Sequence, residues 1–492
     1  MQTVAGHLLY LSLMAVLGMW ALGSDPGALA SGLLVVGVLG AWRYSWVALN
    51  LVRAAIYIKL AFPRLRARAE AAYAAKGLPA HAFFLVTSYK IDTATTTRVY
   101  RSIFRAAAAS AGGATIVASV VDSADARLIA QIRAIEAPDP VRVKLILDQI
   151  PGTGKRDALA RSFRLLAREA PSRHDILAVV DGDSCVPEDL VARTAPFFTD
   201  PRVGALTTDE AVEISHGRLF RDWFRLRFTQ RQIMMSSMGL SGRVLTLTGR
   251  MSVFRADLAT QSDFIALVQS DHIDHWRLGR VNFLTGDDKS TWFWLLKNGW
   301  RMPYLPDVAS LSMESQPKPG FLDSAVTLMI RWFGNMLRTN GRALALSPAK
   351  IGVFTWWSIL DQRLSIWTTL AGPISVVIGA VMISPMVLVA YVAWVLFTRY
   401  VFTAVLALTR PSGGFPITYP VLLYFGQIVG AAVKSYVLFR LDRQRWTRQQ
   451  AEGRRGAALS LATRLKGWSS TFAHGLALGW LTLGMVLVSA AG

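Results

Sequence analysis

The chain has 492 residues, of which 52% are hydrophobic and only 17% are charged. This composition excludes an ordinary soluble enzyme, so part of the chain is expected to lie in lipid. The formal net charge of +21 is explained mainly by lysine and arginine retained on the cytoplasmic side of a membrane, with attraction to an acidic substrate or polymer as the alternative; nucleic acid is not an expected partner, because no nucleic-acid-binding motif accompanies the charge.

The N-terminal region holds two apolar runs, 8–22 and 27–42, separated by the turn-like GSDPG. Each run is slightly short for a hydrocarbon core of about 30 Å, and together they predict a helical hairpin. No lysine or arginine precedes the first run, so a signal peptide is not expected. Residues 44–62 are expected along the membrane interface. The cations beyond the hairpin place the next domain in the cytoplasm; they are Arg43, Arg53, Lys59, Arg64, Arg66 and Arg68.

Short β-branched runs alternate with helical stretches from about residue 82 onward, which predicts a parallel α/β sheet. The four runs are AFFLVTS, ATIVASVV, VRVKLILD and ILAVVD. In such sheets, ligands bind beyond the carboxyl ends of the strands. The polar residues that fall there are Thr87, Asp122, Asp148 and Asp181.

The last of these runs ends in Asp181-Gly182-Asp183. Two carboxylates one residue apart at a strand end are suited to a hard divalent cation, which neutralises a diphosphate leaving group. A polar turn is the alternative, since Asp-Gly is common in turns. Cys185, the only cysteine, excludes an internal disulfide, fits a reducing cytosol and is expected to be a small buried side chain rather than a nucleophile.

A basic segment, PGTGKRDALARSF, places Lys155 and Arg156 between a glycine turn and a predicted helix. Phosphate binds at such positions, although the segment is not a Walker loop. The alternative is an ordinary basic helix start.

An acidic segment, FLTGDDKSTWF, places Asp287 and Asp288 at another helix start. One of two adjacent carboxylates has a raised pKa when they share a site, so either one fits a general base; an acidic helix cap is the alternative. Just before it, DHIDH at 271–275 lacks the residue pattern of a zinc site and is expected to be a polar loop.

LMIRWFGNMLR, 328–338, predicts an amphipathic helix that enters a second membrane block. Its Arg331, Trp332 and Arg338 fit either a tryptophan at a membrane interface or a sugar-binding platform at the mouth of a channel.

The C-terminal block predicts further spans and a basic cytoplasmic segment, 440–468. Cytoplasmic ends near residues 350 and 440 require an even number of crossings between them. Either 352–363 contributes to an extra span or 416–438 does not cross fully. The sequence leaves a total of five or six crossings as alternatives. The apolar runs are 365–383, 385–408, 416–438 and 471–490.

Three cations, Arg363, Arg399 and Lys434, lie within or beside these runs. Charges inside a membrane usually face the interior of the helix bundle, so they are candidates for lining a channel that attracts a polyanion. Snorkelling to the interface is the alternative for Arg363 and Lys434. Arg399 is the strongest channel candidate.

In order and spacing, these motifs resemble those of the processive family 2 glycosyltransferases, the group of cellulose, chitin and hyaluronan synthases. That group has a DxD motif, a [T/G][E/D]D base motif about a hundred residues later and a Q-x-x-R-W motif on an interfacial helix. Here Leu328 stands at the glutamine position, which argues against a plain cellulose synthase. Longer strings resemble the mannuronan synthases, the catalytic subunits of alginate polymerases; they are TSYKIDTATTTRVYR, HWRLGRVNFLTGDDKSTWF, RWFGNMLR and FRLDRQRWTRQ.

The resemblance implies a cytosolic GT-A domain with a Rossmann-like, mostly parallel sheet, 64–318, inserted between transmembrane helices of the bacterial inner membrane. A hairpin and interfacial segment, 1–62, would precede it. Interfacial helices with the RW motif, 319–350, and a channel block, 351–492, would follow.

The resemblance also implies roles for single residues. Asp288 would be the catalytic base, with Asp287 as second choice and Lys289 grouped with them as a catalytic candidate. Asp183 would coordinate Mg²⁺ or Mn²⁺, with Asp181 beside it near the nucleotide. The nucleotide-sugar contacts would come from Thr87, Tyr89, Asp122, Lys155 and Arg156, and the diphosphate and polymer contacts from Arg331 and Trp332. Arg399, the channel candidate, is grouped with these last two as a polymer-binding residue because of its charge within an apolar run.

The implied reaction is an inverting transfer from GDP-mannuronate to β-1,4-linked polymannuronate, coupled to translocation. The implied partners are a co-polymerase that senses cyclic di-GMP and an export machinery. Two alternatives stay open: a family 2 synthase that uses a UDP-sugar, and a catalytically silent membrane scaffold or channel subunit.

Overall fold

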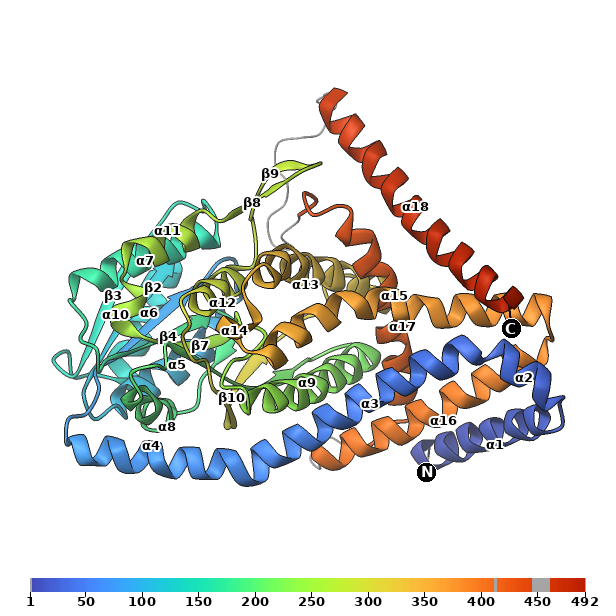
Figure 1. The fold of residues 1–492 in the computed structure, drawn as a ribbon. Helices are drawn as coiled ribbons and strands as arrows, with labels where there is room; N and C mark the ends of the chain where they lie inside the picture. The colour runs from blue at the N-terminus through green and yellow to red at the C-terminus, as the bar shows by residue number, and fades with distance from the viewer. Residues whose placement is uncertain (1, 411–413, 445–460, 492) are drawn as a thin grey trace.

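The computed structural model describes residues 2–410, 414–444 and 461–491. Its centre is an eight-stranded sheet in the order β3-β2-β1-β4-β7-β6-β10-β5. Figure 1 shows this sheet at one end of the molecule, with long helices extending away from it. Residues 82–313 are called the sheet domain below. Its strands are β1 (Ala82–Thr87), β2 (Ala114–Val120), β3 (Val143–Gln149), β4 (Ile176–Asp181), β5 (Ser184–Cys185), β6 (Ala205–Glu213), β7 (Met251–Arg255) and β10 (Tyr304–Met313).

The four strands predicted from the sequence form the parallel half of the sheet. β1 pairs in parallel with β2 and β4, and β2 pairs in parallel with β3. β7 runs antiparallel to β4 and β6, and β5 runs antiparallel to β10, so the sheet is mixed. The predicted fold class, an α/β domain with a mostly parallel sheet between blocks of apolar helices, is confirmed.

Helices connect the parallel strands, because such strands need crossover connections. α5 (Thr93–Ala108) follows β1, α6 (Ser123–Glu136) follows β2, and α7 (Lys155–Arg168) follows β3. β1 and β2 are almost wholly buried, as expected for strands that are covered on both faces. The other elements of the sheet domain are α8 (Leu190–Thr194), η2 (Ala195–Thr199), α9 (Arg218–Gly239), α10 (Ala256–Ala259), α11 (Ser262–Gln269), the hairpin β8 (His272–His275) and β9 (Gly279–Asn282), and α12 (Asp287–Lys297).

The N-terminal helices form a hairpin that continues into a long rod. α1 (Gln2–Leu22) turns through α2 (Pro26–Gly32) into α3 (Leu34–Ile56), and the π-helical turn η1 (Tyr57–Ala61) joins α3 to α4 (Phe62–Lys76). Figure 1 shows α3 and α4 as one rod along the side of the molecule.

Residues 44–62, predicted as a separate interfacial segment, belong to the same rod. No glycine or proline interrupts them, and Pro63 stands in the first turn of α4, where its missing N–H costs little. Arg53 donates to the Ser237 carbonyl at 3.1 Å, and the Tyr57 hydroxyl donates to the Tyr304 carbonyl at 2.7 Å. The rod is therefore fastened to α9 and β10 of the sheet domain.

The C-terminal part consists of α13 (Phe321–Leu344), α14 (Pro348–Ile351), α15 (Val353–Met382), α16 (Met386–Thr409), α17 (Thr418–Leu438) and α18 (Leu461–Ala491). Residues 353–363 are the start of the single helix α15, which disfavours the alternative in which 352–363 contributes to an extra span. Part of the predicted basic segment 440–468, residues 445–460, lies outside the described residues. Within those residues, six helical segments are long and apolar enough to cross a membrane: Val4–Leu22, Leu34–Lys76, Val353–Met382, Met386–Thr409, Thr418–Leu438 and Thr463–Ala490.

Both ends of α17 contact the sheet domain. At its start, the Thr418 hydroxyl donates to the Asp222 carboxylate of α9 at 2.9 Å. Just past its end, the Phe439 carbonyl accepts from Arg277 of the β8–β9 hairpin at 2.6 Å. Figure 1 shows α17 running across the direction of α15 and α16, and it packs against α9 and α13.

Candidate active site

The carboxyl ends of β1, β2 and β4 bring the predicted strand-end residues to one edge of the sheet. The register places Thr87 between Ser119 of β2 and Asp181 of β4. Asp122 follows β2, is exposed and caps α6 by accepting from the Ala124 amide at 2.8 Å.

Asp148 and Tyr89 lie near the carboxyl ends of β3 and β1, respectively. Asp148 is buried and pairs with Arg161 of α7 at 2.8 Å, so its charge is already compensated. Tyr89 follows β1 and lies against Gly152 of the predicted phosphate loop, where an added Cβ would stand 3.3 Å from the Tyr89 ring. The loop therefore passes directly beside the strand ends.

Lys155 joins two motifs that are far apart in the sequence. Its ammonium lies 2.6 Å from the Asp181 carboxylate at the end of β4 and 3.1 Å from the Asp287 carboxylate at the start of α12. The glycine loop, the DGD segment and the GDD segment, each predicted separately, therefore meet at one cation.

The three carboxyl groups around this cation differ in proton affinity. Burial, the nearby Asp183 and Asp287 raise the pKa of Asp181 to about 6, although Lys155 opposes the shift. Burial alone would also raise the pKa of Asp287, but Lys155 and Arg156 outweigh it and hold that pKa below the usual value. Burial and the charge of Asp287 raise the pKa of Asp288. Of the adjacent pair, Asp288 is thus the better proton acceptor.

Arg156 and Lys289 form their hydrogen bonds outside the cluster around Lys155, although the charge of Arg156 acts on Asp287. The Arg156 guanidinium is buried and donates to the Val268 carbonyl at 2.9 Å and the Ser290 hydroxyl at 3.0 Å, while Lys289 donates to the Leu245 carbonyl at 3.0 Å. Burial lowers the pKa of Lys289 to about 8. These contacts fix the position of α12, which carries Asp287 and Asp288, so Arg156 and Lys289 act as positioning residues in the structure.

α13, the helix with the RW motif, also holds the GDD segment. Asn335 accepts from the Thr285 hydroxyl at 2.8 Å and from Arg338 at 2.6 Å. Gly286 has a φ of +86°, and an added Cβ would stand 2.9 Å from Asn335. The close approach of α13 therefore requires glycine immediately before Asp287.

The predicted polymer-binding residues lie at different places. Trp332 is half-buried and stacks on Trp223 of α9, with ring centroids 5.7 Å apart, and Arg331 precedes it on α13. Arg399 of α16 donates weakly to Tyr44 of α3 at 3.4 Å. The structure thus brings Trp332, but not Arg399, against the helices beside the sheet.

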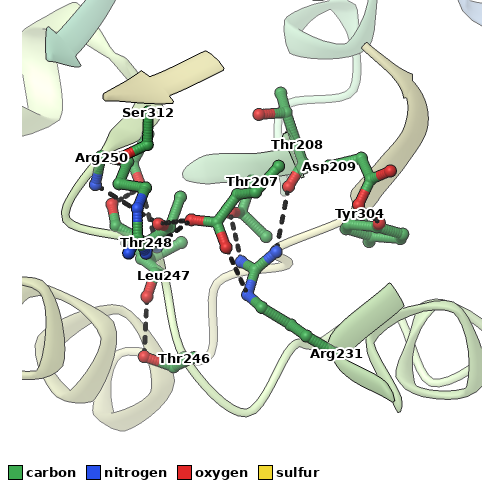
Figure 2. Close-up of polar contacts among 12 residues, drawn as sticks. Thr207, Thr208, Asp209, Arg231, Thr246, Leu247, Thr248, Arg250, Tyr304 and Ser312 are labelled. Carbon is green, nitrogen blue, oxygen red and sulfur yellow. Dashed lines mark hydrogen bonds and ion pairs between the residues drawn. The ribbon is translucent and has the colours of Figure 1, made fainter. Parts of the chain in front are cut away.

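A buried polar network beside Asp183 was not predicted. Glu210 of β6 is 1% exposed and pairs with Arg231 at 3.2 Å and Arg250 at 3.4 Å, and Arg250 also pairs with Glu314 at 2.6 Å. Burial would raise the pKa of Glu210, but the two arginines hold it below the usual value. Figure 2 shows the side chains of Arg231 and Arg250 entering this network from different sides.

This network supports the DGD segment. The Arg250 carbonyl accepts from the Asp181 amide at 3.0 Å, and Gly249 lies close enough that an added Cβ would stand 3.6 Å from the Asp181 carboxylate. The signal in the sequence is the pair of acidic residues inside the β-run ALTTDEAVE, since charges in a buried strand require partners.

Asp181 and Asp183 offer hard oxygen ligands that suit Mg²⁺ or Mn²⁺. Burial raises the pKa of Asp181, and the charges of Asp183 and Asp287 add to the shift, so a divalent cation would supply compensating positive charge at this site. In the described part of the chain, no three His, Cys, Asp or Glu side chains are grouped to hold a metal ion.

Two other residues singled out in the sequence have local partners. Asp271 of the DHIDH cluster is buried and pairs with Arg342 at 2.6 Å. The next four residues form strand β8, which pairs with β9, so the prediction of a polar loop at 271–275 is wrong. Cys185 is half-buried, and burial raises the pKa of its thiol, which disfavours the nucleophilic thiolate.

A family profile described as "Glycosyltransferase like family 2" matches residues 79–335. This range contains the whole sheet and the charged residues around Lys155. The chain belongs to glycosyltransferase family 2. The predicted family and enzyme class are confirmed.

Two relatives of this family 2 glycosyltransferase align over almost their whole length. "Glycosyltransferase alg8" of Pseudomonas syringae pv. tomato is 43% identical over 470 residues, covering 95% of this chain and 94% of the relative. "Glycosyltransferase alg8" of Azotobacter vinelandii is 42% identical over 442 residues, covering 89% and 88%. Among solved structures, a mannosyltransferase from Pyrobaculum calidifontis in complex with GDP-Man and Mn²⁺ has a TM-score of 0.42 and 18% identity, covering 79% of this chain and 97% of its own.

Proposed function

We propose that this family 2 glycosyltransferase transfers mannuronate from GDP-mannuronate to a growing β-1,4-linked polymannuronate, the precursor of alginate. The observation that carries the proposal is the contact of Lys155 with both Asp181 and Asp287, because it sets the nucleotide edge of the sheet against the segment that carries the candidate base Asp288. The relatives named alg8 support an alginate-type glycosyltransferase. The net charge of +21 suits an acidic donor and product.

The reaction would be one in-line displacement with inversion. The acceptor hydroxyl oxygen attacks the anomeric carbon, the bond from that carbon to the GDP oxygen breaks, and the hydroxyl proton passes to Asp288. Asp288 fits this role better than Asp287, whose charge is engaged by Lys155. A divalent cation bound at Asp181 and Asp183 would neutralise the GDP leaving group.

The remaining predicted residues keep their proposed roles around this centre. Thr87, Tyr89 and Asp122 surround the carboxyl ends of β1 and β2 and would bind the nucleoside. Arg331 and Trp332 on α13 would hold the diphosphate and the growing end. Arg399 stays a candidate for the path through the membrane.

We also propose five crossings of the bacterial inner membrane, by α1, α3, α15, α16 and α18, with α17 lying along the cytoplasmic interface. The contacts of both ends of α17 with the sheet domain support this arrangement. It satisfies the requirement for an even number of crossings between residues 350 and 440. Residues 64–318 would then be the cytosolic catalytic domain, 319–350 the interfacial helices and 351–492 the channel block.

A panel of donors tests the proposal. Membranes that contain the full-length protein and its co-polymerase, proposed here as a cyclic di-GMP sensor, receive labelled GDP-mannuronate, UDP-glucose or UDP-N-acetylglucosamine in separate reactions. We expect polymer only from GDP-mannuronate, and only with a divalent cation present. Polymer from a UDP-sugar alone would instead establish the alternative family 2 synthase.

A further inference from the structure

Arg227 of α9 is a half-buried cation that forms no ion pair with any acidic side chain in the described part of the chain. Its guanidinium lies 4.4 Å from the ring centroid of Trp332 and 5.1 Å from that of Trp223. Among the described residues it forms no ion pair or hydrogen bond. Burial and the charge of Arg250 lower its pKa to about 10.

Arg227 differs from the neighbouring arginines, which have acidic partners. Arg231, one turn further along α9, pairs with Glu210, and Arg250 pairs with Glu210 and Glu314. A cation that is removed from water without a counter-ion is unfavourable, so the protein gains from an anion that binds beside Arg227.

Lys434 of α17 is a second cation of this kind. It is half-buried, and its ammonium lies 4.8 Å from the ring centroid of Phe333. Lys434 forms no ion pair in the described part of the chain. Asp361 is the acidic residue that acts on its charge, and the Asp361 carboxylate is already paired with Arg43 at 2.5 Å.

The two cations flank consecutive residues of one helix. Trp332 and Phe333 lie on α13, which packs against both α9 and α17. Two residues further along α13, Asn335 contacts Thr285 at the GDD segment. The unpaired charges therefore lie between the active site and the C-terminal apolar helices.

We propose that Arg227 and Lys434 bind carboxylates of the acidic polymer as it leaves the active site, and so select a uronate chain. This inference rests on the proposed function. A polyuronate carries a carboxylate on every sugar, so one chain supplies an anion to both cations, whereas a neutral polysaccharide supplies none. The aromatic rings beneath the cations fix the positions of the charges.

The test uses membranes with the full-length protein, its co-polymerase and labelled GDP-mannuronate. Each reaction contains a short oligomannuronate acceptor or the same oligomer with its carboxyl groups reduced to alcohols. For Arg227→Gln and Lys434→Gln we expect the KM for the acidic acceptor to rise about tenfold each, because a charge-assisted contact is lost, with little change in kcat. The KM for the neutral acceptor is expected to stay unchanged.

Arg225→Gln is the matched control, because Arg225 is exposed on the same helix, and it should behave as wild type. Arg227→Lys retains the charge and should restore most of the preference for the acidic acceptor. An equal loss with both acceptors would assign Arg227 a purely structural role, and an unchanged KM for the acidic acceptor would overturn the inference while leaving the proposed function intact. If the wild type makes no product from GDP-mannuronate, the proposed function and the inference fail together.

Discussion

Replacing Asp288 with asparagine is expected to lower the rate of sugar transfer by about 10²- to 10⁴-fold, the usual contribution of a general base. The amide has the same shape but does not accept the proton of the acceptor hydroxyl. Burial and the neighbouring Asp287 raise the pKa of Asp288, which makes it the stronger base of the pair. The measurement is the initial rate of GDP release in membranes with matched amounts of protein.

Glu70→Gln controls for the loss of one negative charge, because Glu70 is exposed on α4 and forms only a surface pair with Arg66. Asp287→Asn should retain more activity than Asp288→Asn. Transfer by Asp288→Asn within about twofold of wild type would remove Asp288 from the mechanism.

Replacing Lys155 with methionine should abolish transfer and also destabilise the domain. The change leaves Asp181 and Asp287 without the ammonium that lies within 3.1 Å of both. Removing one partner of a buried ion pair lowers the free energy of unfolding by about 3–5 kcal/mol. Because the two carboxylates are partly exposed, we expect a loss at the lower end of this range. The melting temperature and the rate of GDP release are the two measurements.

The pH dependence of this loss has a definite sign. Lys155 lowers the pKa of both carboxyl groups, so without it the pKa of Asp181, which is already above its usual value, rises further and the pKa of Asp287 rises as well. The destabilisation is therefore present at neutral pH and shrinks as acid protonates the two groups. The difference in melting temperature from wild type should therefore be smaller near about pH 5 than at about pH 7.5. Lys144→Met is the control, since Lys144 is half exposed and pairs with Glu169. Equal destabilisation by both variants would contradict the bridging role.

The parallel half of the sheet could be predicted because each strand is a short β-branched run followed by a polar residue. The same logic found Lys155, Asp181, Asp287 and Asp288, since charged residues at strand ends and helix starts are local signals. Their convergence on Lys155 is a tertiary contact between positions 155, 181 and 287, and no local pattern contains it.

Other features depend on partners that a local pattern does not show. Arg156 follows Lys155 directly, yet its side chain points to Val268 and Ser290, because the two residues project in different directions from the start of α7. Glu210 lies in a strand whose partners, Arg231 and Arg250, come from a helix and a loop. α17 is apolar and long enough to cross a membrane, and our proposal that it lies along the interface rests on tertiary features, namely the contacts at its two ends and its direction across α15 and α16.

The most direct test of the central claim is the size and composition of the product made from labelled GDP-mannuronate in membrane vesicles by wild type and by Asp288→Asn. The account predicts that wild type makes a long polymer that an enzyme specific for β-1,4-linked mannuronate degrades, with one GDP released per sugar, and that the variant makes almost none. A single-sugar product, a polymer resistant to that enzyme, or equal polymer from both proteins would contradict it.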